Sequence, residues 1–279
     1  PSLMYAQHLN SADADGNLDV IGFSFVGAPG LHLGHTRGVH WAATTGFADA
    51  MDMWAVSVDD SGTMVTVAGE QRPLTTRSET IRVAGMPDMV LDIEEVEGHG
   101  VLLGDTLLEP LGINEAFLVG NDKRLLLNWT GFRATNESAA FLDFARAQTV
   151  DEYEAAVDLM EVGTFNWLSA DANDISYRVN VLIPDRGDPS ARKMPYTIIP
   201  DEDPATFWTD KWLPPNQLPR SRAPATGFIT TANNDPWGFT GDGDVHNDPW
   251  YYGFFYSAGY RAKRLDDELK RLTAQGNLS

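Results

Sequence analysis

Residues 38–54 read Gly-Val-His-Trp-Ala-Ala-Thr-Thr-Gly-Phe-Ala-Asp-Ala-Met-Asp-Met-Trp, and no other stretch says more about the fold. A strand-like run of apolar and small residues ends at the turn Thr44-Thr45-Gly46, where glycine would tolerate a positive φ. A turn that follows a strand directly can point a backbone N–H at an anion. The stretch therefore predicts a strand end with an anion-stabilising turn, and a plain strand end is the alternative.

Two carboxylates follow this turn. Asp49 and Asp52, with the Met51 carbonyl between them, are the hard oxygen ligands that Ca²⁺ takes. A distal carboxylate, for which Asp248 is the candidate, would complete the site. A solvated acidic loop is the alternative interpretation. The stretch at 241–244 also resembles a calcium loop, but it lacks the downstream Glu of an EF-hand and is better interpreted as a turn.

Composition excludes several classes of function. The chain has 279 residues, 40 acidic against 20 basic residues and a net charge of −20, which argues against nucleic acid and anionic membrane as partners. It has no cysteine, which excludes disulfides, thiolate metal sites and cysteine nucleophiles. No apolar run approaches the roughly 18 residues that a membrane span needs, and no signal peptide is visible.

The secondary structure expected from the sequence is mixed. Apolar alternation around turn formers predicts strands and hairpins at 18–25, 54–58 with 64–67, 80–83 with 89–93, and 165–171 with 175–179. Helices are expected after 136–138, from Thr149 with Glu152 as a capping box, and from about Ser257 to Ala274. The inner face of the first helix would carry Phe141, Leu142, Phe144 and Ala145, that of the second Ala156 and Leu159, and that of the third Leu265, Leu269 and Leu272.

The proline-rich segment 184–225 reads as a long ordered loop, because Trp208 and Trp212 need burial. No boundary or repeat divides the chain, so residues 1–279 are expected to form one α+β layered domain.

A second segment carries chemistry. Residues 231–237 read Thr-Ala-Asn-Asn-Asp-Pro-Trp, and the amide of Asn233 offers two N–H donors that suit the oxyanion of a tetrahedral intermediate. An ordinary turn is the alternative. The histidines lack zinc-site spacing, and the chain has no Gly-x-Ser-x-Gly elbow. The sequence thus offers oxyanion donors without a recognisable nucleophile.

Four segments in the right order resemble the β-subunit of the penicillin acylase family of N-terminal-nucleophile amidohydrolases: 34–52, 170–173, 227–236 and 258–261. The resemblance implies an αββα sandwich, incomplete in this chain, and autocatalytic cleavage of a precursor. It also implies a new N-terminal Ser as nucleophile, whose α-amine acts as the base. The activity implied is hydrolysis of a linear amide to a carboxylic acid and an amine, and the location implied is periplasmic or secreted.

The same resemblance assigns roles to individual residues. Asn233 would match the oxyanion-hole asparagine, the N–H of Thr45 the second donor, and Arg261 the arginine that organises the site. Structural calcium would be bound by Asp49, Met51, Asp52 and Asp248, with Asp244 as the alternative to Asp248. The acyl pocket would be lined by Leu33, Ala43, Trp129 and Phe165, whose alternative role is that of ordinary core residues.

The chain departs from the family pattern at its beginning. Ser2 lies beyond the position where the nucleophile is expected, so the nucleophile is expected outside this chain. The resemblance further implies an α-subunit and a remaining part of the β-subunit as partners, and an isolated chain that is inactive.

Two alternative functions remain open. One is a non-catalytic, calcium-stabilised β-rich module of the same fold. The other is a carbohydrate-binding β-sandwich, which the aromatic residues Trp237, Trp250, Tyr251 and Tyr252 would serve if they are exposed.

Overall fold

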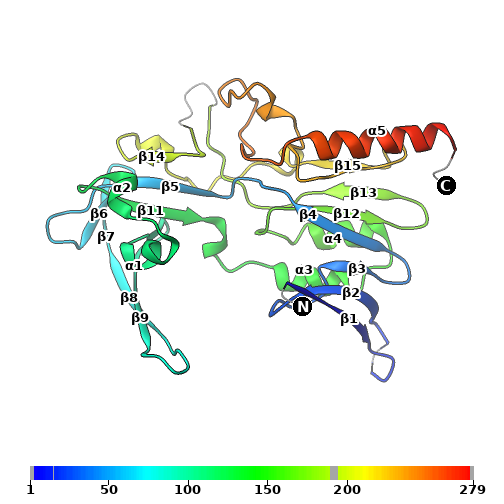
Figure 1. Ribbon diagram of the computed structural model, residues 1–279, viewed down its shortest axis with the longest axis horizontal. Helices are drawn as coiled ribbons and strands as arrows, with labels where there is room; N and C mark the ends of the chain where they lie inside the picture. Colours follow the sequence, from blue (N-terminus) through cyan, green and yellow to red (C-terminus); the bar gives the residue numbers. More distant parts are fainter. Residues whose placement is uncertain (1–2, 15, 189–193, 277–279) are drawn as a thin grey trace.

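Two β-sheets joined end to end make up an elongated molecule (Figure 1). The computed structural model describes residues 3–14, 16–188 and 194–276. Seven strands form one sheet, six form the other, and a two-stranded ribbon is attached to the smaller one. Helices cover parts of these sheets, which confirms the expected α+β class.

The larger sheet is antiparallel at every pairing and has the order β1-β2-β3-β4-β12-β13-β15. The expected strand at 18–25 and the expected hairpin at 165–179 are both confirmed within it. Its strands are β1 Met4–Asn10, β2 Asp19–Phe25, β3 Leu33–His35, β4 His40–Thr45, β12 Phe165–Ala170, β13 Ile175–Arg178 and β15 Arg220–Arg222.

The smaller sheet has the order β14-β5-β11-β10-β9-β8, and the pair β14–β5 is parallel. The expected hairpin across residues 85–87 is confirmed as β8–β9. The expected hairpin of 54–58 with 64–67 is confirmed only by the bridge Val58–Val65, because the second strand pairs instead with β7 in the ribbon. The strands of this sheet are β5 Met51–Val56, β8 Thr75–Ile81, β9 Met89–Val96, β10 Gly100–Leu102, β11 Arg124–Trp129 and β14 Ile198–Pro200, and those of the ribbon are β6 Met64–Val67 and β7 Glu70–Pro73.

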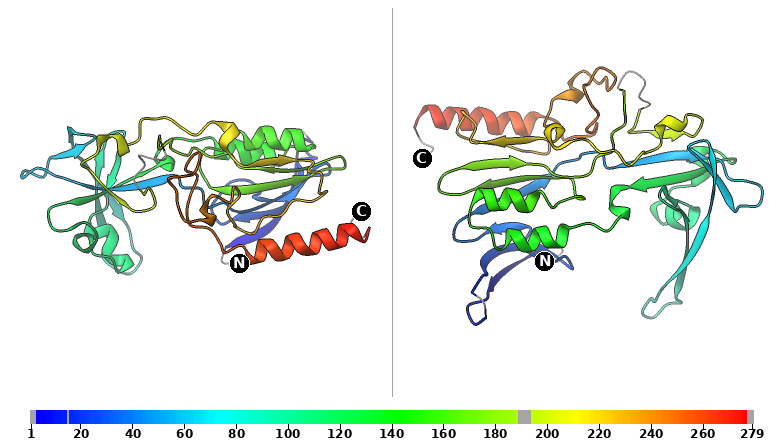
Figure 2. Two further views of the ribbon diagram at one scale, coloured as in Figure 1. Left: turned by 90° about the horizontal axis from the view of Figure 1, so that it is seen from above. Right: turned by 180° about the vertical axis from the view of Figure 1, so that it is seen from behind.

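Two helices, α3 Glu137–Phe144 and α4 Val150–Val157, cover one face of the larger sheet (Figure 2). The expected cap of α4 is confirmed, since the Thr149 hydroxyl accepts a hydrogen bond from the Glu152 N–H at 3.2 Å. The predicted inner positions Leu142 and Leu159 are wrong. Leu142 is 43% exposed because Ala140, Phe141 and Phe144 face the sheet, and Leu159 lies beyond the end of α4.

The C-terminal helix α5, Tyr260–Ala274, lies on the opposite side of the larger sheet from α3 and α4, along its β15 edge (Figure 2). Its start is three residues later than expected. Leu265 is 45% exposed, and α5 has no buried residue. The shorter helices are α1 Asp105–Leu108 and α2 Glu115–Val119, with 3-10 turns at Glu109–Leu111, Thr130–Phe132, Pro204–Thr206, Pro215–Gln217 and Phe239–Gly241.

The loop expected at 184–225 is ordered in its described part, while residues 189–193 lie outside the described residues. Trp208 packs edge-on against Trp54, with ring centroids 6.2 Å apart, and against Trp212 at 6.1 Å. The aromatic group offered for carbohydrate binding is not exposed. Tyr251 and Tyr252 are each 2% exposed, and the other two, Trp237 and Trp250, pack against one another.

Residues 38–54 connect the two sheets. β4 belongs to the larger sheet and β5 to the smaller one, so residues 46–50 cross the junction between them (Figure 1). The turn at Thr45 and the two aspartates therefore lie where both sheets meet, and their positions depend on how this junction is held.

Candidate active site

Asn233, Thr45 and Arg261 come together at the end of β4. The Asn233 side-chain Nδ2 donates a hydrogen bond to the Thr45 carbonyl at 2.9 Å. The Arg261 Nη2 donates to Asn233 Oδ1 at 2.8 Å and to the Ala232 carbonyl at 2.6 Å. The structure thus unites three predicted residues from the strand end, the 231–237 segment and the start of α5.

Arg261 determines which way the Asn233 amide faces. A guanidinium has only donors, so the amide atom next to it must be the oxygen, and the nitrogen must face Thr45. The backbone of Asn233 has φ of +63°, a left-handed conformation that asparagine tolerates better than most residues. The side chain is therefore held from both ends.

The turn after β4 differs in detail from the sequence expectation. Positive φ occurs at Phe47 (+55°) and not at Gly46. Glycine is needed at 46 for another reason: a Cβ there would lie 2.9 Å from the Thr164 carbonyl oxygen, which already accepts a hydrogen bond from the Gly46 N–H. The close approach of β4 to the start of β12 fixes the turn.

Asn166 supports the site and was missed by sequence reasoning. Its side chain is buried, and its Nδ2 lies 3.1 Å from Thr44 Oγ1, 3.0 Å from Thr231 Oγ1 and 3.3 Å from the Thr45 carbonyl oxygen. Its Oδ1 accepts from the Tyr177 hydroxyl at 2.7 Å. Burial raises the pKa of Tyr177 well above its usual value, so this hydroxyl stays a neutral donor. An asparagine within an apolar strand was the available signal.

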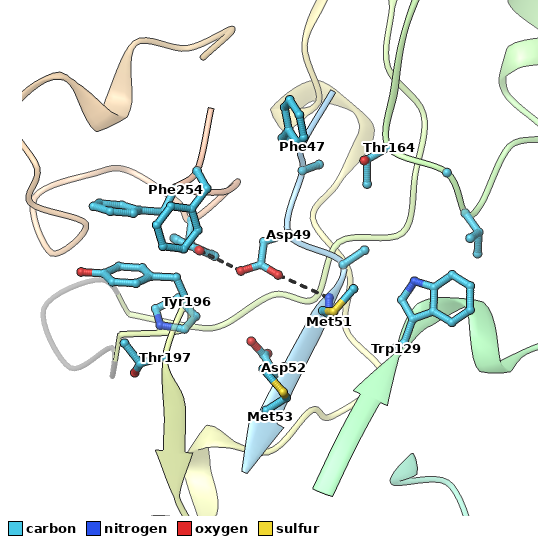
Figure 3. Close-up of a pocket in the computed structure, with 17 residues that line it drawn as sticks. Phe47, Asp49, Met51, Asp52, Met53, Trp129, Thr164, Tyr196, Thr197 and Phe254 are labelled. Atoms are coloured by element: carbon cyan, nitrogen blue, oxygen red, sulfur yellow. Dashed lines mark hydrogen bonds between the residues drawn. The ribbon is translucent and has the colours of Figure 1, made fainter. Parts of the chain in front are cut away.

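Three of the four predicted calcium ligands, Asp49, Met51 and Asp52, contact an arginine (Figure 3 shows the two aspartates). Arg186, from the proline-rich segment, donates from Nε to Asp52 Oδ2 at 2.9 Å and from Nη2 to Asp52 Oδ1 at 3.1 Å. The Nη2 also lies 3.1 Å from the Asp49 carbonyl oxygen and 3.4 Å from the Met51 carbonyl oxygen. Burial raises the pKa of Asp52, and the guanidinium opposes that shift.

The distal ligand is not brought to this pair. Among the described residues, no three or more His, Asp or Glu side chains gather so that they could hold a metal ion, so Asp248 does not form such a group with Asp49 and Asp52. Asp248 is buried, and Asp244 is exposed and accepts a hydrogen bond from the His246 N–H at 2.9 Å. The calcium site stays a prediction from resemblance, with two of its carboxylates together.

A cavity of about 540 Å³ lies beside the turn (Figure 3). Of the predicted pocket residues, only Trp129 lines it, together with Phe47, Thr164, Tyr196 and Phe254. The other three are placed elsewhere: Ala43 and Phe165 pack against the core beneath α3 and α4, and Leu33 is half-buried on β3.

The sequence model of the penicillin amidase family matches residues 1–279. The chain belongs to this family. This penicillin amidase family member has several curated relatives. A penicillin acylase 2 proenzyme from Pseudomonas sp. (strain SE83) is 28% identical over 83% of this chain and 28% of that protein. The acyl-homoserine lactone acylase QuiP from Pseudomonas fluorescens (strain Pf0-1) is 26% identical over 91% of this chain and 28% of that protein.

The fold of this family member is also that of a solved acylase. A thermostable penicillin G acylase from Alcaligenes faecalis superposes with a TM-score of 0.74 at 19% identity, over 97% of this chain and 44% of that chain. The N-terminal-nucleophile hydrolase fold expected from the sequence is thereby confirmed. The chain spans less than a third of the length of the curated relatives above. In the described part of the chain, no helix is long and apolar enough to cross a membrane.

Proposed function

We propose that this chain supplies the oxyanion-stabilising part of an acylase that hydrolyses linear amides to a carboxylic acid and an amine. One observation carries the proposal: the amide of Asn233 is fixed between Arg261 and the Thr45 carbonyl, at 2.8 Å and 2.9 Å. Thr45 and Arg261 are exposed, so a substrate can reach this amide from solvent. Membership of the penicillin amidase family supports the same conclusion.

The chemistry needs donors at a developing negative charge. An asparagine amide has two N–H groups. One of those on Asn233 is used by the Thr45 carbonyl, and no other acceptor within the described residues takes the second. That second N–H, with the backbone N–H of Thr45, would stabilise the oxyanion formed when a nucleophile attacks the amide carbonyl. Cleavage of the C–N bond releases the amine, and water then releases the acid from the acyl ester.

The nucleophile is proposed to be the N-terminal Ser of a processed β-subunit, in a part of the protein other than residues 1–279. The name proenzyme of one relative and the fraction of its length that this chain matches support this arrangement. The chain would then be the central part of the β-subunit, assembled with an α-subunit and the rest of the β-subunit. A periplasmic or secreted location is proposed from the same resemblance. Mass spectrometry of the fractionated natural protein would test both.

The direct test is hydrolysis by the complete natural protein. Phenylacetyl, glutaryl and long-chain acyl amides, including an acyl-homoserine lactone, would be offered, and the released amine measured. Turnover of at least one, abolished when the proposed nucleophilic Ser is replaced, is the expected result. A folded, fully processed protein that hydrolyses none of them would contradict the proposal and favour the non-catalytic module.

Arg261 is expected to act as a positioning residue. Arg261→Ala removes a charge-assisted hydrogen bond worth about 1.5–3 kcal/mol, so kcat should fall about ten- to a hundredfold while KM changes little. Arg264→Ala is the matched control, because Arg264 lies on the same helix and forms an ion pair with solvent-accessible Glu268, at 2.6 Å, away from Asn233. The same kcat and KM in Arg261→Ala and Arg264→Ala would show that Arg261 does not position the catalytic amide.

Trp129 is expected to influence acyl selectivity. It lines the mostly apolar cavity next to the turn, so Trp129→Ala should shift the ratio of kcat/KM between bulky and short acyl donors by about tenfold or more. Phe165→Ala is the comparison, since Phe165 packs on the core beneath the helices and should mainly lower stability. An unchanged profile across acyl donors in Trp129→Ala would contradict the assignment of this cavity as the acyl pocket.

A further inference from the structure

We propose that the guanidinium of Arg186 takes the place of a calcium ion between Asp49 and Asp52, so that this protein holds the junction of its two sheets with a cation of its own. The proposal concerns the bend between β4 and β5 and does not depend on the acylase activity. It replaces the family expectation of structural calcium at these two residues.

The position of Arg186 is that of a central cation. Its side chain is 6% exposed and the Asp52 side chain 1% exposed, so the pair is removed from solvent. Its Nε and Nη2 contact both carboxylate oxygens of Asp52 at 2.9 and 3.1 Å, a bidentate geometry that a guanidinium makes and an ammonium cannot. The Nη2 also reaches the Asp49 and Met51 carbonyl oxygens.

The oxygens that calcium would need already have donors. Asp49 Oδ2 accepts from the Tyr251 hydroxyl at 2.8 Å, and Asp49 Oδ1 lies 3.5 Å from Arg186 Nη2. Asp52 Oδ2 also accepts from Trp208 Nε1 at 2.6 Å. Calcium requires six to eight oxygens at about 2.3–2.6 Å. It could reach these oxygens only after the guanidinium had left, because two cations bound to the same oxygens would repel one another.

An aromatic ring also packs against the face of the Arg186 guanidinium. Its Cζ lies 4.9 Å from the centre of the Tyr251 ring, and the same tyrosine donates its hydroxyl to Asp49. A cation over an aromatic face gains further stabilisation when it is desolvated. The ring and the two aspartates thus form a cradle that fits a planar guanidinium. Ca²⁺ has no comparable use for the ring face, so the fit favours arginine.

The consequence is a junction that does not depend on free calcium. A tethered cation is present at any calcium concentration, while an ion site empties when calcium is removed. The bend that Arg186 binds continues directly from the Thr45 turn. We therefore expect the turn to keep its position in chelator.

The first experiment is thermal unfolding of the complete natural protein in millimolar CaCl₂ and in EDTA, with terbium luminescence sensitised by tyrosine and tryptophan as a second readout. The expected result is the same Tm in both solutions. Any terbium luminescence should be the same in the wild-type protein and in Asp52→Asn, because no ion binds at Asp52. A Tm that rises by several degrees in calcium, with the rise lost in Asp52→Asn, would overturn the proposal.

The second experiment removes the arginine. Arg186→Met should lower the Tm in EDTA, and calcium should raise the Tm of this variant because the aspartates are now open to an ion. Arg133→Met is the matched control: Arg133 also pairs with an aspartate, at 2.6 Å, and lies over a tryptophan ring, but is half-exposed. A wild-type Tm for Arg186→Met without calcium would contradict the proposal. If Arg186→Met does not fold, the conservative variant Arg186→Lys takes its place, and the comparison of the wild-type Tm in calcium and in EDTA still tests the proposal.

Discussion

Replacing Asn233 with alanine is expected to lower kcat for amide hydrolysis by about 10²- to 10³-fold, the cost measured for loss of one oxyanion-hole donor. The variant loses the side-chain amide that Arg261 and the Thr45 carbonyl hold between them. The donor acts on charge that develops in the transition state, so kcat should fall far more than substrate affinity. Steady-state kinetics on the complete natural protein would measure the change.

A matched control separates chemistry from folding. Asn173→Ala alters an exposed asparagine in the turn between β12 and β13, away from the site, and should leave kcat unchanged. Asn233→Ala should keep the circular dichroism spectrum of this control and lose only a little Tm, because alanine tolerates the left-handed backbone at φ of +63° less well than asparagine does. Near-normal turnover by a folded Asn233→Ala protein would exclude this residue from the oxyanion hole.

Replacing Asp52 with alanine is expected to cost about 3–5 kcal/mol of unfolding free energy, the range for breaking a buried ion pair by removing one partner. Asp52 is the bidentate acceptor of Arg186 and also accepts from Trp208. Its loss leaves a buried guanidinium without its main counter-charge. Urea unfolding followed by circular dichroism would measure the loss through the shift of the midpoint.

The control for Asp52→Ala is Asp143→Ala. Asp143 is half-exposed and lies 3.9 Å from Arg146 on the surface of α3, so its removal should cost less than about 1 kcal/mol. The loss at Asp52 should be equal in calcium and in EDTA, because Arg186 and not an ion is the partner. Equal midpoints for the two variants would show that the buried pair contributes no more to stability than an exposed one.

The sequence allowed much of the fold to be predicted because local patterns decide local structure. The Thr149 cap and the hairpins at 80–93 and 165–179 were found from turn formers and apolar alternation, which act within a few residues. Strand partners were harder. Residues 64–67 have the pattern of a strand, but nothing within them specifies β7 as the main partner.

Some residues of the candidate site could also be predicted from local sequence, and others could not. Asn233, Thr45 and Arg261 could be named because their types and neighbours fit a known signature, and the structure brings them into contact. Asn166 could not be named, because its role arises only when Thr44 and Thr231 meet on either side of it. Of the four predicted pocket positions, the structure places only Trp129 at the cavity beside the turn.

The sequence by itself determined the family, the α+β class and the residues proposed for the oxyanion site, since these depend on residue types in short, ordered segments. Only the tertiary structure decided which cation the two aspartates meet. Arg186 is 134 residues from Asp52 along the chain and lies within a proline-rich segment that has no periodic pattern. Its contact with the aspartates exists because two sheets and a long ordered segment pack at one junction, and no local pattern encodes that packing.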